Sequence, residues 1–146
     1  MDLFEKKTIV YTAMSRHLFY ARMLICKYVL ENAAVPLNPF NVWGYFLYEL
    51  VDRNLVRCGN NNIVRIADET WVFGPIADGV LAEIEYAMRL RKVLKFFSAG
   101  SKYSDINPIT IEEIVFEPDV INNRNTESIK IDLSKYLNLI SNRNNP

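Results

Sequence analysis

Short runs of β-branched and aromatic residues alternate along this chain with longer segments whose apolar residues recur at helical spacing. Three runs stand out, at residues 8–13, 70–73 and 92–97. The first two are nearly continuous in apolar character, which is typical of strands buried on both faces of a parallel sheet. Strands that alternate with helices restrict the chain to an open, mostly parallel sheet with right-handed crossovers.

The segments between these runs have helical patterns. Ser15 is a candidate N-cap for a helix that extends to about Asn32. Residues 43–51 follow helical spacing through Trp43, Phe46, Leu47, Leu50 and Val51, and a break at 58–62 precedes a short helix over 63–67. Asp78 and Gly79 open a further helix that runs through Arg91.

Two weaker runs complete the predicted sheet. Residues 34–37 contain Pro36, which favours a short edge strand, and residues 109–116 form a candidate fifth strand. The tail is rich in Asn and charge but contains a short helical pattern over 131–140. We therefore predict one α/β domain over 1–146, a flavodoxin-like (Rossmann-like) three-layer sandwich with a five-stranded sheet, its core at about 8–118 and a C-terminal tail at 119–146.

Composition excludes several classes of function. The 146 residues carry 17 basic and 17 acidic side chains, so the chain has no net charge with which to attract a nucleic-acid polymer or an anionic membrane. Two cysteines and one histidine are too few for a structural zinc site, and we predict neither metal nor cofactor. Without a signal-like N-terminus or a membrane-spanning run, we expect a cytoplasmic protein with reduced cysteines.

Ligands of such sheets bind at the carboxyl ends of the strands. The loops that follow the strands place a set of unusual side chains there, and we take as candidate substrate-binding residues Ser15, Arg16, His17, Asn38, Phe40, Phe73 and Gly79. Arg16 could bind an anion and His17 could act as acid or base. Plain structural roles compete with these: Ser15 as an N-cap, and Arg16 and His17 as surface residues.

The helix that opens at Asp78 is the most informative segment. Its N-terminal amides and dipole suit an anionic group, and Glu83 follows about one turn inside the helix. A carboxylate there could be aimed into the cleft. The competing interpretations are an N-cap for Asp78, and for Glu83 an exposed position or an ion pair with a cation such as Arg16.

Two short motifs, Val10-Tyr11-Thr12-Ala13 and Gly79-Val80-Leu81-Ala82-Glu83-Ile84-Glu85-Tyr86-Ala87, resemble the fingerprint of the nucleoside 2-deoxyribosyltransferase superfamily, which includes nucleotide N-glycosidases. The similarity covers residues 8–97. One departure is Ala77, where family members often carry Asp or Ser.

The resemblance implies that Glu83 is a nucleophile that attacks the anomeric carbon of a nucleoside or nucleotide, with Tyr11 beside it and Asp78 as a further catalytic residue. The reaction would be N-glycosidic cleavage or base exchange through a glycosyl ester. Two alternatives remain open: a nucleotide-binding or sensing module without turnover, which the Ala77 departure would allow, and a scaffold for protein association. Aromatic residues over 43–51 favour a homo-oligomer.

Overall fold

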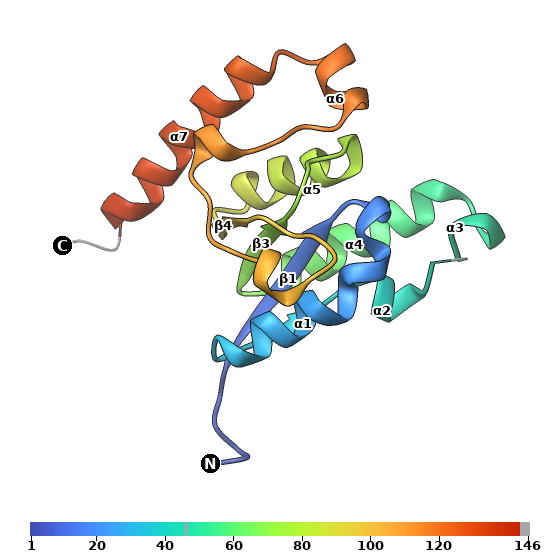
Figure 1. Cartoon of the computed structure of the whole chain (residues 1–146), viewed down its shortest axis with the longest axis vertical. Coiled ribbons are helices and arrows are strands. Elements are labelled where there is room, and N and C mark those ends of the chain that lie inside the picture. Colours follow the sequence, from blue (N-terminus) through green and yellow to red (C-terminus); the bar gives the residue numbers. More distant parts are fainter. Residues whose placement is uncertain (46, 144–146) are drawn as a thin grey trace.

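The computed structural model describes residues 1–45 and 47–143 and contains a parallel sheet of four strands in the order β2-β1-β3-β4 (Figure 1). The strands are β1 (Thr8–Met14), β2 (Ala34–Leu37), β3 (Glu69–Phe73) and β4 (Val93–Phe97). The predicted α/β class is confirmed, and so is the position of β2 at an edge of the sheet. Tyr11 of β1 lies opposite Thr70 of β3.

One face of the sheet is covered by η1 (Arg16–Ala21) and α1 (Arg22–Glu31). Ser15 caps this segment as predicted, because its hydroxyl accepts a hydrogen bond from the His17 N–H. The first six residues after Ser15 form a 3₁₀ helix, so the predicted single helix has two parts. The apolar core on this face includes Val10, Ile25, Trp71 and Phe73.

The opposite face packs against α5 (Asp78–Arg89), and Figure 1 shows α5 and α1 on opposite sides of β1 and β3. Tyr11, Val72 and Leu94 point to this face and contribute to a second core with Ile84 of α5. The predicted helix is confirmed, although it ends before Arg91, which adopts a positive φ of 60°. The core has two parts, one on each face of the sheet, because successive side chains of a strand point to opposite faces.

The predicted fifth strand over 109–116 does not form. The segment makes one isolated bridge, between Ile76 and Phe116, and the preceding Pro108 makes another with Phe97. A 3₁₀ turn, η3 (Ile111–Glu113), interrupts the segment. Pro108, directly before the segment, has no N–H to donate, which limits its pairing with β4 to an isolated bridge. The apolar residues that suggested a strand are nevertheless buried, since Ile114 and Phe116 belong to the core beside α5.

The helical cover between β2 and β3 also differs from the prediction. α2 (Pro39–Trp43) ends at Gly44, whose φ is +76°, and α3 (Leu47–Leu50) follows as a separate turn. Phe46, which carried part of the predicted helix, lies outside the described residues.

The predicted break at 58–62 is wrong, because α4 (Arg53–Ile66) is continuous through it. The Asp52 side chain caps α4 by accepting from the Asn54 N–H, and Asn60 in its middle is buried and hydrogen-bonded to neighbouring elements. Tertiary contacts of this kind override the low helix propensity of glycine and asparagine.

The C-terminal part contains η2 (Tyr103–Asp105), α6 (Pro118–Asn123) and α7 (Thr126–Arg143). The terminal helix is therefore longer than predicted, and α6 was not foreseen. Leu133 and Tyr136 of α7 are buried in the core that α5 shares, so the helix docks on the domain. Within 1–45 and 47–143, no helix combines the length and the apolar character needed to cross a bilayer.

Candidate active site

Glu83 and Tyr11 meet on the face of the sheet that α5 covers. Glu83 lies on the second turn of α5, and the Tyr11 ring is completely buried below it in β1. The Glu83 side chain as a whole is half-buried, but its Oε2 atom is fully buried. Among the described residues, neither the Tyr11 hydroxyl nor Glu83 Oε2 has a hydrogen-bond partner outside this pair. Buried polar atoms left without a partner are rare and costly, which makes this pair a candidate for function.

Burial controls the ionisation of the Glu83 carboxyl. Removal from water raises the pKa of Glu83 from 4.5 to about 8, although the adjacent Tyr11 hydroxyl opposes the rise by favouring the charged form. The pKa of Tyr11 is raised well above its ordinary value, first by burial and then by the neighbouring Glu83 charge. Strong perturbation by burial together with a specific partner is characteristic of catalytic acids and bases. The alternative of an exposed helix glutamate does not fit this environment.

A third unpartnered group lies beside Tyr11. Thr70 faces the same side of the sheet in the neighbouring strand, and its Oγ1 is buried with no hydrogen-bond partner in the described part of the chain. Only these three buried side-chain atoms lack a partner over residues 1–45 and 47–143. They therefore concentrate on one face of the sheet, around β1, β3 and α5.

The hydroxyl of Tyr48 in α3 is hydrogen-bonded to Asn60 of α4, and the charge of Glu83 influences its pKa. Burial raises the pKa of Tyr48, the Asn60 amide lowers it, and the charge of Glu83 raises it further. Asn60 Nδ2 donates to the Tyr48 hydroxyl at 3.4 Å, and Trp43 Nε1 donates to Asn60 Oδ1 at 2.8 Å. Sequence reasoning assigned Tyr48 only to a protein interface, and no local pattern in the sequence relates it to Glu83.

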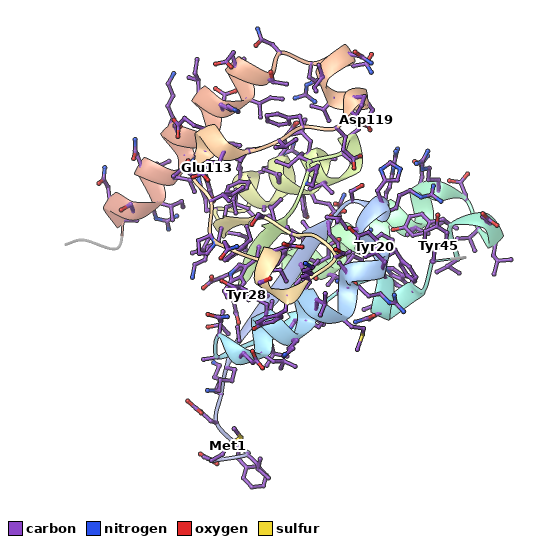
Figure 2. The ribbon with its side chains drawn as sticks, viewed as in Figure 1. Met1, Tyr20, Tyr28, Tyr45, Glu113 and Asp119 are labelled. Carbon is purple, nitrogen blue, oxygen red and sulfur yellow. The ribbon has the colours of Figure 1, made fainter. Side chains whose placement is uncertain are left out.

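Asp78, the other predicted catalytic residue, is the exposed first residue of α5 and not its N-cap, which is Ala77. Its backbone N–H donates to Asp119 Oδ2 at 3.1 Å, and Figure 2 shows Asp119 beside the start of α5. No described contact joins the Asp78 side chain to Tyr11 or Glu83. Gly79 is exposed, and a Cβ at this position would meet nothing within 4 Å.

The loop after β1 is tied to the C-terminal segment through Glu117, which the sequence analysis did not single out. The Ser15 hydroxyl donates to Glu117 Oε1 at 2.7 Å, and His17 Nδ1 lies 3.1 Å from the same oxygen. Arg16 is exposed and its guanidinium donates to the Tyr45 hydroxyl at 2.9 Å. Tyr45 lies between α2 and α3 (Figure 2). The predicted binding roles of Ser15, Arg16 and His17 stay predictions.

Three other predicted binding residues are buried inside the fold. Asn38 caps α2 through its side-chain oxygen and donates to Thr12 Oγ1, so its polar atoms are occupied. Phe40 is buried in the core on the α1 face, and Phe73 is fully buried and stacks on Phe97. The structure thus places Asn38, Phe40 and Phe73 in packing and capping positions.

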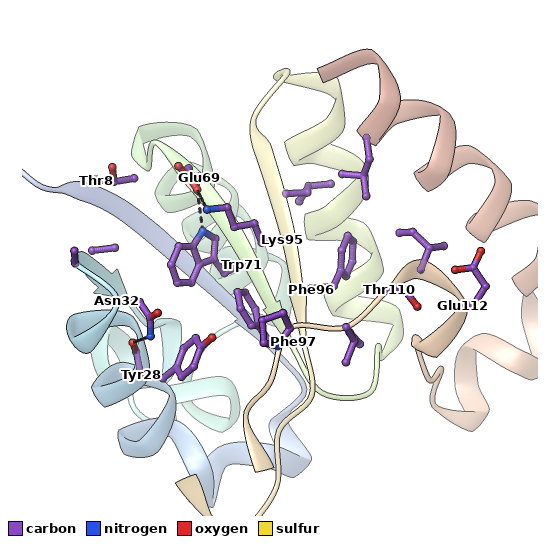
Figure 3. A pocket seen from close by; sticks show the side chains of 17 residues that line it. Thr8, Tyr28, Asn32, Glu69, Trp71, Lys95, Phe96, Phe97, Thr110 and Glu112 are labelled. Carbon is purple, nitrogen blue, oxygen red and sulfur yellow. Dashed lines mark hydrogen bonds and ion pairs between the residues drawn. The ribbon is translucent and has the colours of Figure 1, made fainter. Parts of the chain in front are cut away.

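A groove of about 780 Å³ lies away from this site, between β4 and the start of β1 (Figure 3). Its lining includes Thr8, Trp71 and Lys95 but neither Tyr11 nor Glu83. Its central polar groups satisfy one another, because Glu69 Oε1 accepts from Trp71 Nε1 and lies 3.6 Å from Lys95 Nζ. The lining reaches the first residues of β1 and β3 at Thr8 and Glu69 and follows β4 from Leu94 to Phe97, so the groove runs along the β4 edge of the sheet. Ligands of such sheets usually bind in the crevice at the carboxyl ends of the strands.

The described residues contain no cluster of three or more His, Cys, Asp or Glu side chains that could hold a metal ion. The buried groups that gather at the candidate site are the Glu83 carboxyl and the hydroxyls of Tyr11 and Thr70. The chain matches no protein-family model and no curated protein.

Proposed function

We propose that this protein cleaves or exchanges the N-glycosidic bond of a nucleoside or nucleotide, with Glu83 as the nucleophile. The observation that carries the proposal is the buried pair of the Tyr11 hydroxyl and Glu83 Oε2, which have no other hydrogen-bond partner among the described residues and lie on one face of a parallel α/β sheet. A buried carboxyl oxygen with no partner outside the pair is available to a ligand. The resemblance of the motifs around Tyr11 and Glu83 to the deoxyribosyltransferase superfamily supports the same assignment.

In this mechanism the ionised Glu83 carboxylate attacks the anomeric carbon as the bond to the base breaks. The electron pair of that bond leaves with the base, which takes up a proton from solvent. The positive charge that develops on the sugar is stabilised by the carboxylate, and a glycosyl ester forms. Water, or a second base, then attacks the anomeric carbon and releases the carboxylate. The Tyr11 hydroxyl orients Glu83 and favours its charged form.

The raised pKa of Glu83 favours a second candidate function, a nucleotide-binding or sensing module without turnover. With a pKa of about 8, most of the Glu83 population is protonated at neutral pH and cannot act as a nucleophile. A protonated carboxyl can instead donate a hydrogen bond to a ligand. In the catalytic alternative, the developing positive charge of the sugar favours ionisation during the reaction.

The deciding experiment measures base release from ribo- and deoxyribonucleosides and their 5′-monophosphates, with and without a second free base. Under the catalytic proposal wild type releases base, and Glu83→Gln lowers the rate at least about 1,000-fold. The matched control is Glu85→Gln, on the exposed side of the same helix, which should retain activity. Dependence on added base identifies a transferase. Ligand-induced stabilisation without base release supports the binding module. A protein that shows neither stabilisation nor base release rejects both functions.

We further propose a homo-oligomer that buries the surface around α3. Leu50, Val51 and Leu55 are exposed there, and apolar residues that gather at a surface favour association. Light scattering on wild type and Leu50→Glu tests this: the variant should have the lower mass, and a monomeric wild type rejects the proposal.

A further inference from the structure

Residues 1–7, called the arm below, lead from the start of β1 away from the domain, with Met1 at the far end (Figure 2). The first six are exposed, and three large apolar side chains among them have exposed fractions of 83% or more: Met1, Leu3 and Phe4. The described polar contacts of the arm are internal, because the Phe4 N–H donates to Asp2 and Lys7 pairs with Glu5. Exposed apolar groups that gather in this way mark a site of association.

The groove along the β4 edge offers a surface of matching character. One side of it is β4, and the other is the 108–112 segment. The Ile109 N–H donates to the Phe96 carbonyl, and the chain then turns away from β4 into η3, which opens a space of about 780 Å³. Its lining includes three partly buried apolar side chains: Ile109, Ile111 and Leu137. Thr8 and Glu112 lie at opposite ends of the groove (Figure 3).

The charges of the arm and of the groove are complementary. Among residues 1–45 and 47–143, Lys6 is the charged side chain of the arm that has no ion-pair or hydrogen-bond partner. In the groove Lys95 pairs with Glu69 at 3.6 Å, and the Glu112 carboxylate is the charged group left without a described partner. Lys130 Nζ donates to the backbone carbonyl of Glu112 and not to its carboxylate. One unpaired cation in the arm therefore corresponds to one unpaired anion in the groove.

The geometry favours contact between two copies over contact within one chain. Lys6 is two residues from Thr8, whereas Glu112 lies at the other end of the same groove (Figure 3). If a two-fold axis sets two grooves antiparallel, Thr8 of each copy lies beside Glu112 of the other, and each arm enters the other groove there. Each arm brings on the order of 500 Å² of apolar surface through its three large side chains. Two arms and the surfaces that they cover then reach the roughly 1,200–2,000 Å² of a specific interface.

We propose that two copies of this chain associate by exchanging arms. Leu3 and Phe4 of each copy lie in the groove of the other, and Lys6 pairs with the other copy's Glu112. This interface shares no residue with the surface around α3, and it does not depend on glycosidic chemistry at Glu83.

The test reverses the two complementary charges, separately and in a mixture. Lys6→Glu and Glu112→Lys each place like charges at both contacts of a dimer, and each should raise the dissociation constant about tenfold in sedimentation equilibrium. A mixed dimer of the two variants has opposite charges at both contacts, so an equimolar mixture should associate as tightly as wild type. The matched control is Asp132→Lys, which reverses an exposed charge on α7 and should change nothing.

The apolar part is tested by Phe4→Ser. Because a two-fold dimer contains each contact twice, this change should raise the dissociation constant at least about 100-fold. Melting temperatures establish that the variants fold. A monomeric wild type, unchanged association in these variants, or weakened variants that do not recover on mixing would overturn the inference. An oligomer that only Leu50→Glu dissociates would also overturn it, and would leave the proposed α3 interface intact.

Discussion

Replacing Glu83 with glutamine removes one titrating proton from the core while keeping the size of the side chain. The folded protein holds that proton up to a pH of about 8, whereas an unfolded chain releases it near 4.5. Wild type therefore loses stability as pH rises through this interval, because ionisation favours the unfolded state. The interval multiplied by about 1.4 kcal/mol per pH unit gives a loss of at most about 5 kcal/mol. The glutamine variant has no such loss.

Denaturant unfolding at pH 5 to 9 measures the effect as the stability of Glu83→Gln minus that of wild type. This difference should rise by about 1.4 kcal/mol per pH unit between pH 5 and 8 and then level off, since all other titrating groups cancel. A new, unpaired amide shifts the whole curve but leaves its slope unchanged. The control is Glu85→Gln, whose carboxylate pairs with Arg124 at 2.8 Å near the surface and should not follow this slope. A flat or falling difference for Glu83→Gln would refute the argument that burial controls this carboxyl.

Two further predictions concern rates and backbone. If Glu83 acts as a nucleophile, kcat/KM for base release should rise with pH up to about 8. Tyr11→Phe should move this rise to higher pH, because the Tyr11 hydroxyl lowers the pKa of Glu83. A pH–rate profile without a rise contradicts the role of Glu83 as a nucleophile. Gly74→Ala should destabilise the fold by about 2 kcal/mol in thermal or chemical unfolding, because φ is +74° and the new Cβ would lie 2.3 Å from Leu18 Cδ1. Gly79→Ala, which meets no neighbour within 4 Å in a helix, should instead stabilise by up to about 1 kcal/mol, and equal effects of the two changes would contradict this explanation.

The sheet could be predicted from the sequence because its strands carry local signals. Continuous β-branched and aromatic runs mark β1 and β3, and Pro36 marks an edge strand. The same kind of signal wrongly predicted a fifth strand over 109–116, where Ile114 and Phe116 are buried by tertiary packing and not by strand pairing. Apolar composition predicts burial, but it does not distinguish a strand from an irregular segment that covers the core.

Some residues of the candidate site could likewise be predicted from the sequence, and others could not. Tyr11 and Glu83 could be singled out because each lies in a short motif at a predictable place in a strand or helix. Tyr48 and Glu117 could not, because their significance depends on contacts with Asn60 and Ser15 that only the folded chain creates. For Asn38 the sequence suggested ligand binding, and the folded chain adds a structural role, because its polar atoms serve a helix cap and a neighbouring threonine.

The bonds made by the 115–117 segment also bear on the order in which the site is completed during synthesis. Glu117 accepts from Ser15, while the Ile76 N–H donates to the Val115 carbonyl and the Glu117 N–H to the Ile76 carbonyl. The loop after β1 and the loop before α5 are thus joined by residues that a ribosome adds long after both. A nascent chain that already contains the whole sheet still lacks this connection. The loop after β1 and the loop before α5 can therefore gain these hydrogen bonds only after residues 115–117 have been synthesised.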